Sequence, residues 1–158
     1  MNPVAERPPE CPLVRGERKR ARNMSVKAMY YFAYGSNLNQ KQMRERCSDS
    51  KPMFTAILPN YKLVFVGWSR TWRGGVASIK SFRGDRVRGA IYEVSEQCLQ
   101  RLDRYEVDYK RFKVTVVGED DELIEAITYI KAGQLEEAPP SKEYLAVIQQ
   151  GLRDWRLF

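Results

Sequence analysis

The chain has 158 residues, of which 43% are hydrophobic and 30% are charged, a length and composition that predict one globular domain. Its 27 Lys and Arg residues outnumber its 20 Asp and Glu residues, and it contains no histidine. The missing histidine excludes Ser-His-Asp and Cys-His catalysis, histidine-bound metals and imidazole acid–base chemistry. A general acid or base must therefore be a carboxylate, a lysine, a tyrosine or a cysteine.

The three cysteines, Cys11, Cys47 and Cys98, are far apart in the sequence. Because they include no CxxC pair, they predict neither a zinc site nor a disulfide framework, and they favour a reducing, cytoplasmic location. The sequence also lacks a signal-peptide pattern and any apolar run near the roughly 18 residues that cross a membrane, so we expect no membrane partner.

Residues 1–28 differ in composition from the rest, with seven basic and three acidic residues. Four prolines and no sustained apolar period predict a basic tail that is disordered. Met24 and Met29 leave another interpretation open, in which this tail is an artefact of start-site choice. The tail lacks the aromatic residues of a stacking platform, so we expect no nucleic-acid partner. The alternative is that its basic residues bind nucleic acid or another polyanion. We place the folded domain at residues 29–158.

The first half of that domain predicts several strands and one polar helix. An aromatic strand comes first, and Gly35-Ser36-Asn37 closes it. Pro59-Asn60 predicts a break between two later strands, and Gly84-Asp85 predicts a hairpin. The expected elements are a strand at 30–34, a helix at 39–46, and strands at 54–58, 61–68, 76–79 and 87–94, the last with a close-approach glycine at Gly89.

The second half adds two helices and two alternating strands. Ser95 is a plausible N-cap for the first helix, and Pro139-Pro140-Ser141 begins the second. The expected elements are a helix at 96–104, strands at 112–117 and 124–130, and a last helix that carries Tyr144, Leu145, Ile148, Leu152 and Trp155 on one face. Strands dominate and do not alternate regularly with helices, which predicts an α+β fold with a closed or strongly curved sheet.

The junction Tyr34-Gly35-Ser36-Asn37-Leu38 is the first candidate site. A strand ends, a glycine turns the chain and a helix follows, so several backbone N–H groups can point at one carboxylate or phosphate. The alternative is an ordinary strand-to-helix turn with Asn37 or Asn39 as the cap.

Glu106 is the second candidate, at the point where a helix gives way to a strand. Its neighbours Tyr105, Val107 and Tyr109 make an apolar setting, in which burial would raise the pKa of a carboxyl group toward a value useful for proton transfer. The alternative is a solvated glutamate beside Arg104 and Lys110.

Two further segments are weaker candidates on their own. The pair Gly74 and Gly75 allows the backbone to approach a ligand or another strand closely, and a flexible hairpin loop is the alternative. The segment 137–141, which precedes Tyr144 and contains two prolines, predicts a rigid start to a helix.

In combination, these segments resemble the γ-glutamylcyclotransferase family of the YGSN, AIG2-like type. The matching segments follow in order across residues 30–150 and leave out the tail. They are YFAYGSNL at 31–38, WRGGVA at 72–77, GDRVRG at 84–89, LDRYE at 102–106, Tyr129, and APPS at 138–141 with Tyr144.

The resemblance implies a small mixed β-barrel with a few flanking helices and a site at the barrel mouth. It implies cyclisation of a γ-glutamyl group to 5-oxoproline, with release of the attached amine and without a metal or other cofactor. The implied acid–base residue is Glu106. The implied substrate-binding residues are Tyr34, Gly35, Ser36, Asn37, Leu38, Gly74, Gly75, Tyr109, Tyr129 and Tyr144.

Two departures leave the substrate open. Asn37-Leu38 stand where the glutathione-specific branch typically has Leu-Ile, and the γ-glutamylamine branch has Thr-Leu after its glycine. Val107 replaces the glycine usual after the catalytic glutamate. The leaving group, which is an amino acid, an amine or a carrier-attached amine, stays open, as does the oligomeric state. A non-catalytic γ-glutamyl-binding module of the same fold is the alternative function.

Overall fold

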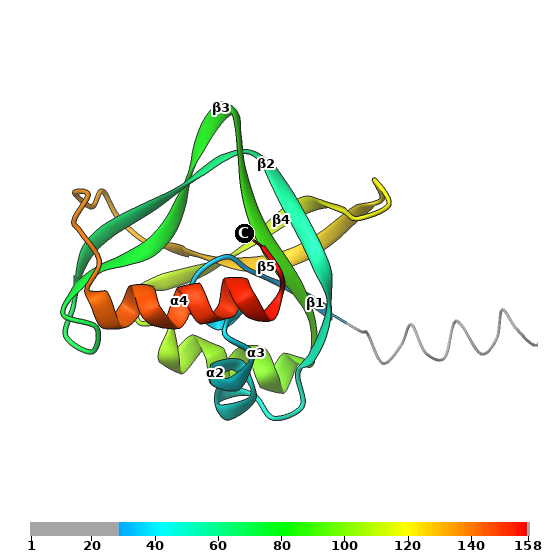
Figure 1. The fold of residues 1–158 in the computed structure, drawn as a ribbon, viewed down its shortest axis with the longest axis horizontal. Helices are drawn as coiled ribbons and strands as arrows, with labels where there is room; N and C mark the ends of the chain where they lie inside the picture. The colour runs from blue at the N-terminus through cyan, green and yellow to red at the C-terminus, as the bar shows by residue number, and fades with distance from the viewer. Residues whose placement is uncertain (1–28, 158) are drawn as a thin grey trace, which may run out of the picture.

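The computed structural model describes residues 29–157 (Figure 1), so the predicted tail and Phe158 lie outside the described residues. Over this range the chain forms five strands, three α-helices and one 3₁₀ turn. In chain order the elements are β1 (Met29–Ala33), η1 (Ser36–Leu38), α2 (Gln40–Arg46), β2 (Lys51–Ser69), β3 (Gly74–Val94), α3 (Glu96–Tyr105), β4 (Tyr109–Gly118), β5 (Leu123–Lys131) and α4 (Lys142–Asp154).

The strands close into a barrel in the order β1-β3-β2-β4-β5. Neighbouring strands are antiparallel except β1 and β5, which pair in parallel at Tyr31 and Ile127. In Figure 1, α2 and α3 lie below the barrel and α4 crosses in front of it. The predicted α+β fold with a mixed barrel is confirmed.

β2 and β3 are continuous, so the predicted break at Pro59-Asn60 and hairpin at Gly84-Asp85 are wrong. Their ladder jumps from the pair Pro59–Arg86 to the pair Tyr61–Ser81, which makes an irregularity within one long pair of strands. Asn60 has φ 63° and Gly84 φ 89°, and the Asn60 Oδ1 atom accepts from the Gly84 N–H at 3.1 Å. Residues that favour turns also favour bulges, so the local signal alone does not separate the two.

The core has two parts because residues of β1 point alternately to opposite faces. Phe32 and Tyr34 belong to the cluster inside the barrel. Tyr31 and Ala33 belong to a second cluster, which includes the fully buried Leu99 of α3. This second cluster fixes α2 and α3 against the barrel wall, and α3 leads directly to Glu106.

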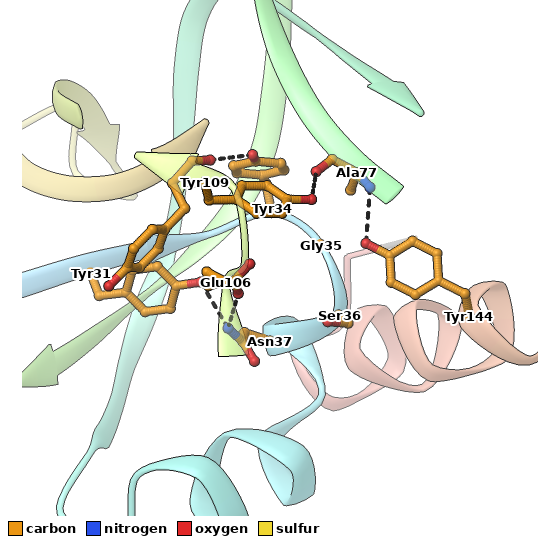
Figure 2. A pocket seen from close by; sticks show the side chains of 10 residues that line it. Tyr31, Tyr34, Gly35, Ser36, Asn37, Ala77, Glu106, Tyr109 and Tyr144 are labelled. Atoms are coloured by element: carbon orange, nitrogen blue, oxygen red, sulfur yellow. Dashed lines mark hydrogen bonds between the residues drawn. The ribbon is translucent and has the colours of Figure 1, made fainter. Parts of the chain in front are cut away.

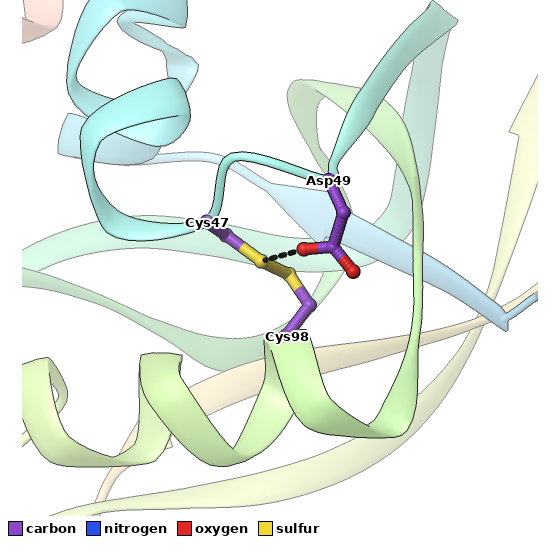
Figure 3. Close-up of side chains that lie close together, drawn as sticks. All are labelled: Cys47, Asp49 and Cys98. Carbon is purple, nitrogen blue, oxygen red and sulfur yellow. Dashed lines mark hydrogen bonds between the residues drawn. A yellow bond between two sulfur atoms is a disulfide. The ribbon is translucent and has the colours of Figure 1, made fainter.

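Cys47 and Cys98 form a disulfide, so the prediction of no disulfide framework is wrong for these two residues (Figure 3). Cys47 is the C-cap of α2 and Cys98 lies in the first turn of α3, with Cα atoms 5.4 Å apart. Because the cysteines are 51 residues apart, their spacing gave no sign of this pairing. In the chain-entropy view, closing such a loop stabilises the fold by about 4 kcal/mol.

Asp49 lies beside this disulfide, with its Oδ1 atom 3.2 Å from the Cys47 sulfur (Figure 3). Its carboxylate already accepts from Ser95 Oγ at 2.8 Å and from Arg101 at 3.1 Å. The two sulfurs are bonded to each other, so this group of potential ligands supports no metal site.

Within residues 29–157, no helix is both long enough and apolar enough to cross a membrane.

Candidate active site

An inner cavity lies where the end of β1, η1, β3, β4 and the first turn of α4 meet the end of α3 (Figure 2). Eight of the sequence-predicted site residues line it, and Tyr31 and Ala77 join them. The eight are Tyr34, Gly35, Ser36, Asn37, Glu106, Tyr109, Tyr129 and Tyr144. The structure does not bring Leu38, Gly74 or Gly75 to this cavity.

The chain turns from β1 into α2 through Gly35 and η1. A Cβ atom at Gly35 would lie 3.1 Å from the Cβ atom of Ala77, so glycine lets the loop approach β3 closely. Asn39 is the N-cap of α2, since its side chain accepts from the Gln42 N–H at 3.0 Å. Leu38 is fully buried and faces the second core cluster, which explains its absence from the cavity lining.

The Asn37 side chain is held by four hydrogen bonds. Its amide nitrogen donates to the Tyr31 hydroxyl at 3.0 Å and to Glu106 Oε1 at 3.1 Å. Its amide oxygen accepts from Gln42 Nε2 at 3.1 Å and from Arg46 at 3.2 Å. Since both donors and both acceptor positions are used, this side chain orients Glu106 (Figure 2).

Glu106 is the C-cap of α3, and its N–H donates to the Leu102 carbonyl at 2.9 Å. Its side chain is 15% exposed, and burial raises the pKa of its carboxyl group above the ordinary value. The charges of Arg46 and Lys131 and the hydrogen bond from Asn37 oppose that rise in pKa. The predicted burial of the Glu106 carboxyl group is therefore confirmed, and the direction of its pKa shift is the one that burial causes.

Three of the tyrosine hydroxyls of the cavity are bonded to backbone groups. Tyr34 donates to the carbonyl of Tyr129, and Tyr109 donates to that of Ala77 at 2.6 Å. The Tyr144 hydroxyl accepts from the Ala77 N–H at 2.9 Å (Figure 2). These bonds fix the rings as walls of the cavity.

Burial raises the pKa values of all five phenols in the cavity, and that of Tyr144 to about 12. A phenol in such surroundings stays protonated at neutral pH and accepts no proton from substrate. Among the residues that line the inner cavity, Glu106 is the one with a carboxyl group, and burial raises the pKa of that group.

The Tyr129 ring reaches the cavity, but its hydroxyl points toward α3. This hydroxyl lies 2.6 Å from Asp103 Oδ1 and 3.1 Å from the Leu99 carbonyl oxygen. Arg111 holds the same Asp103 carboxylate through two bonds of 3.0 and 2.7 Å. Tyr129 therefore links β5 to α3 and supports the position of Glu106.

An outer cavity of about 500 Å³ adjoins the inner one. The two share Ser36, Glu106, Tyr109 and Tyr144, so Glu106 stands where they meet. The outer wall combines aromatic, apolar and cationic side chains. They include Arg46, Trp68, Arg70, Trp72, Arg104, Tyr105, Val107 and Lys131.

Val107 fits its position without a left-handed backbone. Asp108, the next residue, has the positive φ of this turn, at 64°. The Val107 side chain is 63% exposed and lines the outer cavity, while its carbonyl accepts from Lys131 Nζ at 3.0 Å. Val107, at the position where the family resemblance implies a glycine, thus adds a side chain to the wall of the outer cavity.

Gly74 and Gly75 meet the segment before α4. A Cβ atom at Gly74 would lie 2.8 Å from the backbone nitrogen of Ser141, and one at Gly75 would overlap the Ala138 carbonyl. The Gly75 N–H also donates to the Pro139 carbonyl at 3.0 Å. The glycines therefore permit a close backbone approach, one of the two interpretations made from the sequence.

Sequence reasoning missed Tyr31, Ala77, Arg46 and Lys131. Tyr31 and Ala77 lie within the segments 31–38 and 72–77, but no local pattern in those segments shows that the two residues face the cavity. Arg46 and Lys131 approach Glu106 only through the packing of α2 and β5. No local pattern marked them.

A histidine-free barrel whose two cavities meet at a largely buried carboxylate has the make-up of an acid–base enzyme for a small molecule. Residues 31–155 match the family described as "Gamma-glutamyl cyclotransferase, AIG2-like". The chain belongs to that family and is an enzyme of the γ-glutamylcyclotransferase type.

Curated relatives are similar over most of the chain. The Gamma-glutamylcyclotransferase of Bos taurus is 31% identical, over 84% of this chain and 74% of its own. That of Homo sapiens is 32% identical, over 78% of this chain and 70% of its own. A solved structure named "Gamma-glutamyl cyclotransferase" superposes with a TM-score of 0.79 at 30% identity, covering 83% of this chain and 82% of that one.

Proposed function

We propose that the protein converts a γ-glutamyl compound to 5-oxoproline and releases the attached amine or amino acid, with Glu106 as general base and then general acid. The observation that carries this proposal is the place of Glu106 at the junction of the inner and outer cavities. A carboxyl group there can contact both a γ-glutamyl group in the inner cavity and a leaving group in the outer cavity. Burial has also moved its pKa toward neutrality.

The reaction needs no nucleophile from the protein, because the substrate's own α-amino group attacks. The Glu106 carboxylate first takes a proton from the α-ammonium group. The freed nitrogen then attacks the γ-carbonyl carbon and closes a five-membered ring. As the original C–N bond breaks, protonated Glu106 returns its proton to the departing amine. The ring nitrogen gives up its second proton as the lactam forms, and the released amine takes up that proton to become an ammonium, so neither water nor a cofactor is consumed.

Positioning supplies much of the rate, since both reacting groups belong to one molecule. In this proposal the rings of Tyr34, Tyr109 and Tyr144 confine the γ-glutamyl group, and the turn at Gly35 to Leu38 holds its α-carboxylate through backbone N–H groups. The Leu38 N–H already donates to the Gly35 carbonyl at 3.1 Å, which restricts the donors to the earlier residues of the turn. The leaving group occupies the outer cavity.

A pair of isomeric dipeptides tests this function. We expect γ-glutamyl-alanine to yield 5-oxoproline and free alanine, and α-glutamyl-alanine to release no alanine, since its γ-carboxyl group carries no leaving amine. γ-Glutamyl-ethylamine, tested alongside, shows whether a leaving group without a carboxylate is accepted. Thermal stabilisation by γ-glutamyl-alanine without product would instead support the non-catalytic binding module.

A further inference from the structure

We propose that Arg46 is a positioning residue for Glu106, which keeps this carboxyl group ionised and correctly aimed for the α-ammonium of the substrate. The inference rests on the proposed function of Glu106 and adds a second residue, from a different helix, to the same site. It is carried by the contacts that Arg46 makes at the end of α2.

One guanidinium nitrogen of Arg46 touches both members of the Asn37–Glu106 pair. It lies 3.2 Å from Asn37 Oδ1 and 3.7 Å from Glu106 Oε1, the same oxygen that Asn37 contacts. The Arg46 side chain is 14% exposed, so solvent screens this charge less than that of a surface arginine. In the described part of the chain, Arg46 is the one cation within 4 Å of the Glu106 carboxylate.

The helix α2 holds two donors against Asn37. Gln42 and Arg46 are four residues apart, so they share a face of the helix, and both donate to the Asn37 amide oxygen. This pins the amide with its nitrogen toward Glu106. The centre of the Tyr105 ring lies 4.7 Å from the Arg46 guanidinium carbon, a cation–π contact that also holds the arginine.

Other charged and titratable groups also face Glu106, but they differ from Arg46 in the contacts that they make. Lys131 of β5 is the other cation, but its Nζ atom donates to the Val107 carbonyl at 3.0 Å and stands over the Tyr109 ring. The phenols that face Glu106 are Tyr31 and Tyr34 at β1, Tyr109 of β4, Tyr129 of β5 and Tyr144 of α4, and Arg104 and Asp108 flank it on its own segment.

The sign of the effect follows from the charge. A cation near a carboxylate favours its ionised form, so loss of Arg46 should raise the pKa of Glu106 further. A general base works only when ionised, so the acid limb of the kcat/KM profile should move to higher pH. A purely structural arginine would lower the rate at all pH values and leave that limb in place.

The test compares pH profiles of 5-oxoproline formation by the full chain. In Arg46→Gln the side chain stays polar but the charge is gone, and we expect about a tenfold loss or more at the acid end that narrows toward the alkaline plateau. Arg46→Lys restores the charge and should bring the acid limb back toward wild type. Arg44→Gln removes an exposed charge from the same helix and should leave the profile unchanged.

An acid limb in Arg46→Gln that coincides with that of the wild type would overturn the inference, whatever the loss of rate. So would an Arg46→Lys variant that behaves like Arg46→Gln. If Arg46→Gln is recovered unfolded, Arg46→Met takes its place, because it also removes the charge but keeps a long side chain that packs in the same position. An acid limb in Arg46→Met that coincides with that of the wild type would then overturn the inference. Wild-type protein that forms no 5-oxoproline contradicts the proposed function itself, which separates the two failures.

Discussion

The variant Glu106→Gln should lose between about 100-fold and 10,000-fold in kcat, with little change in KM. An amide of the same shape can keep the contact with Asn37 but can neither accept the proton of the α-ammonium nor return it to the leaving amine. Steady-state rates of 5-oxoproline formation measure the effect. Glu125→Gln, at an exposed position on β5, should retain wild-type rates. Glu106→Gln with the wild-type rate would remove Glu106 from the mechanism.

The same variant should be more stable than the wild type at neutral pH. The pKa of Glu106 is higher in the folded protein than in the unfolded chain. The protonated carboxyl group therefore stabilises the fold at pH values below the unfolded-state pKa, and this stabilisation is lost as the pH rises through the folded-state pKa. At neutral pH the ionised carboxylate thus costs stability, and glutamine removes that cost. We expect a higher Tm for Glu106→Gln at pH 7 and a smaller difference as pH falls toward 4. A lower Tm at pH 7 would mean that the Arg46 pair stabilises the fold.

The variant Gly75→Ala should have the largest effect on stability, a loss of about 3 kcal/mol. The added methyl group would overlap the Ala138 carbonyl, which is backbone and has no rotamer to escape into. Moving this segment also disturbs the start of α4, where the Tyr144 hydroxyl accepts from the Ala77 N–H. Both Tm and kcat/KM should fall.

Gly84→Ala is the matched comparison for that variant. No atom lies within 4 Å of a Cβ atom at Gly84, and only its φ of 89° opposes a side chain. We expect a modest loss of Tm with unchanged kcat/KM. Equal losses of Tm and kcat/KM in the two variants would contradict the explanation that position 75 requires glycine because of the close approach to Ala138.

Much of the secondary structure could be predicted because its signals are local. Ser95, for example, accepts from the Cys98 N–H at 3.0 Å and begins α3 where the pattern indicates. Ser141 accepts from the Tyr144 N–H at 3.2 Å and begins α4. Caps of this kind depend on a few neighbouring residues, so a sequence displays them directly.

Features that depend on distant pairing could not be predicted. Whether Asn60 and Gly84 make turns or an irregularity depends on which strand lies opposite, because the same residues favour both. The Cys47–Cys98 disulfide likewise depends on α2 packing beside α3. Closure of the barrel was expected from the family resemblance and the number of strands, and no single segment of the sequence requires it.

The residues of the candidate site also differ in whether a local sequence signal or a distant contact determines their place. Glu106 stood out because aromatic neighbours in its own segment indicated burial. Its side chain is largely buried, but Tyr105 and Val107 are exposed, so the burial comes from residues of other elements that line the inner cavity. Leu38 belongs to a recognisable motif but faces the core, since a short 3₁₀ turn sends neighbouring residues in different directions. Arg46 was missed because the charge that matters for Glu106 comes from another helix.

The most direct test of the account is the product balance for purified protein and γ-glutamyl-alanine. Intramolecular attack, with Glu106 moving the proton, predicts equal amounts of 5-oxoproline and alanine and no free glutamate. Glutamate released together with alanine would show that water, and not the α-amino group, attacks the γ-carbonyl, and would contradict the account.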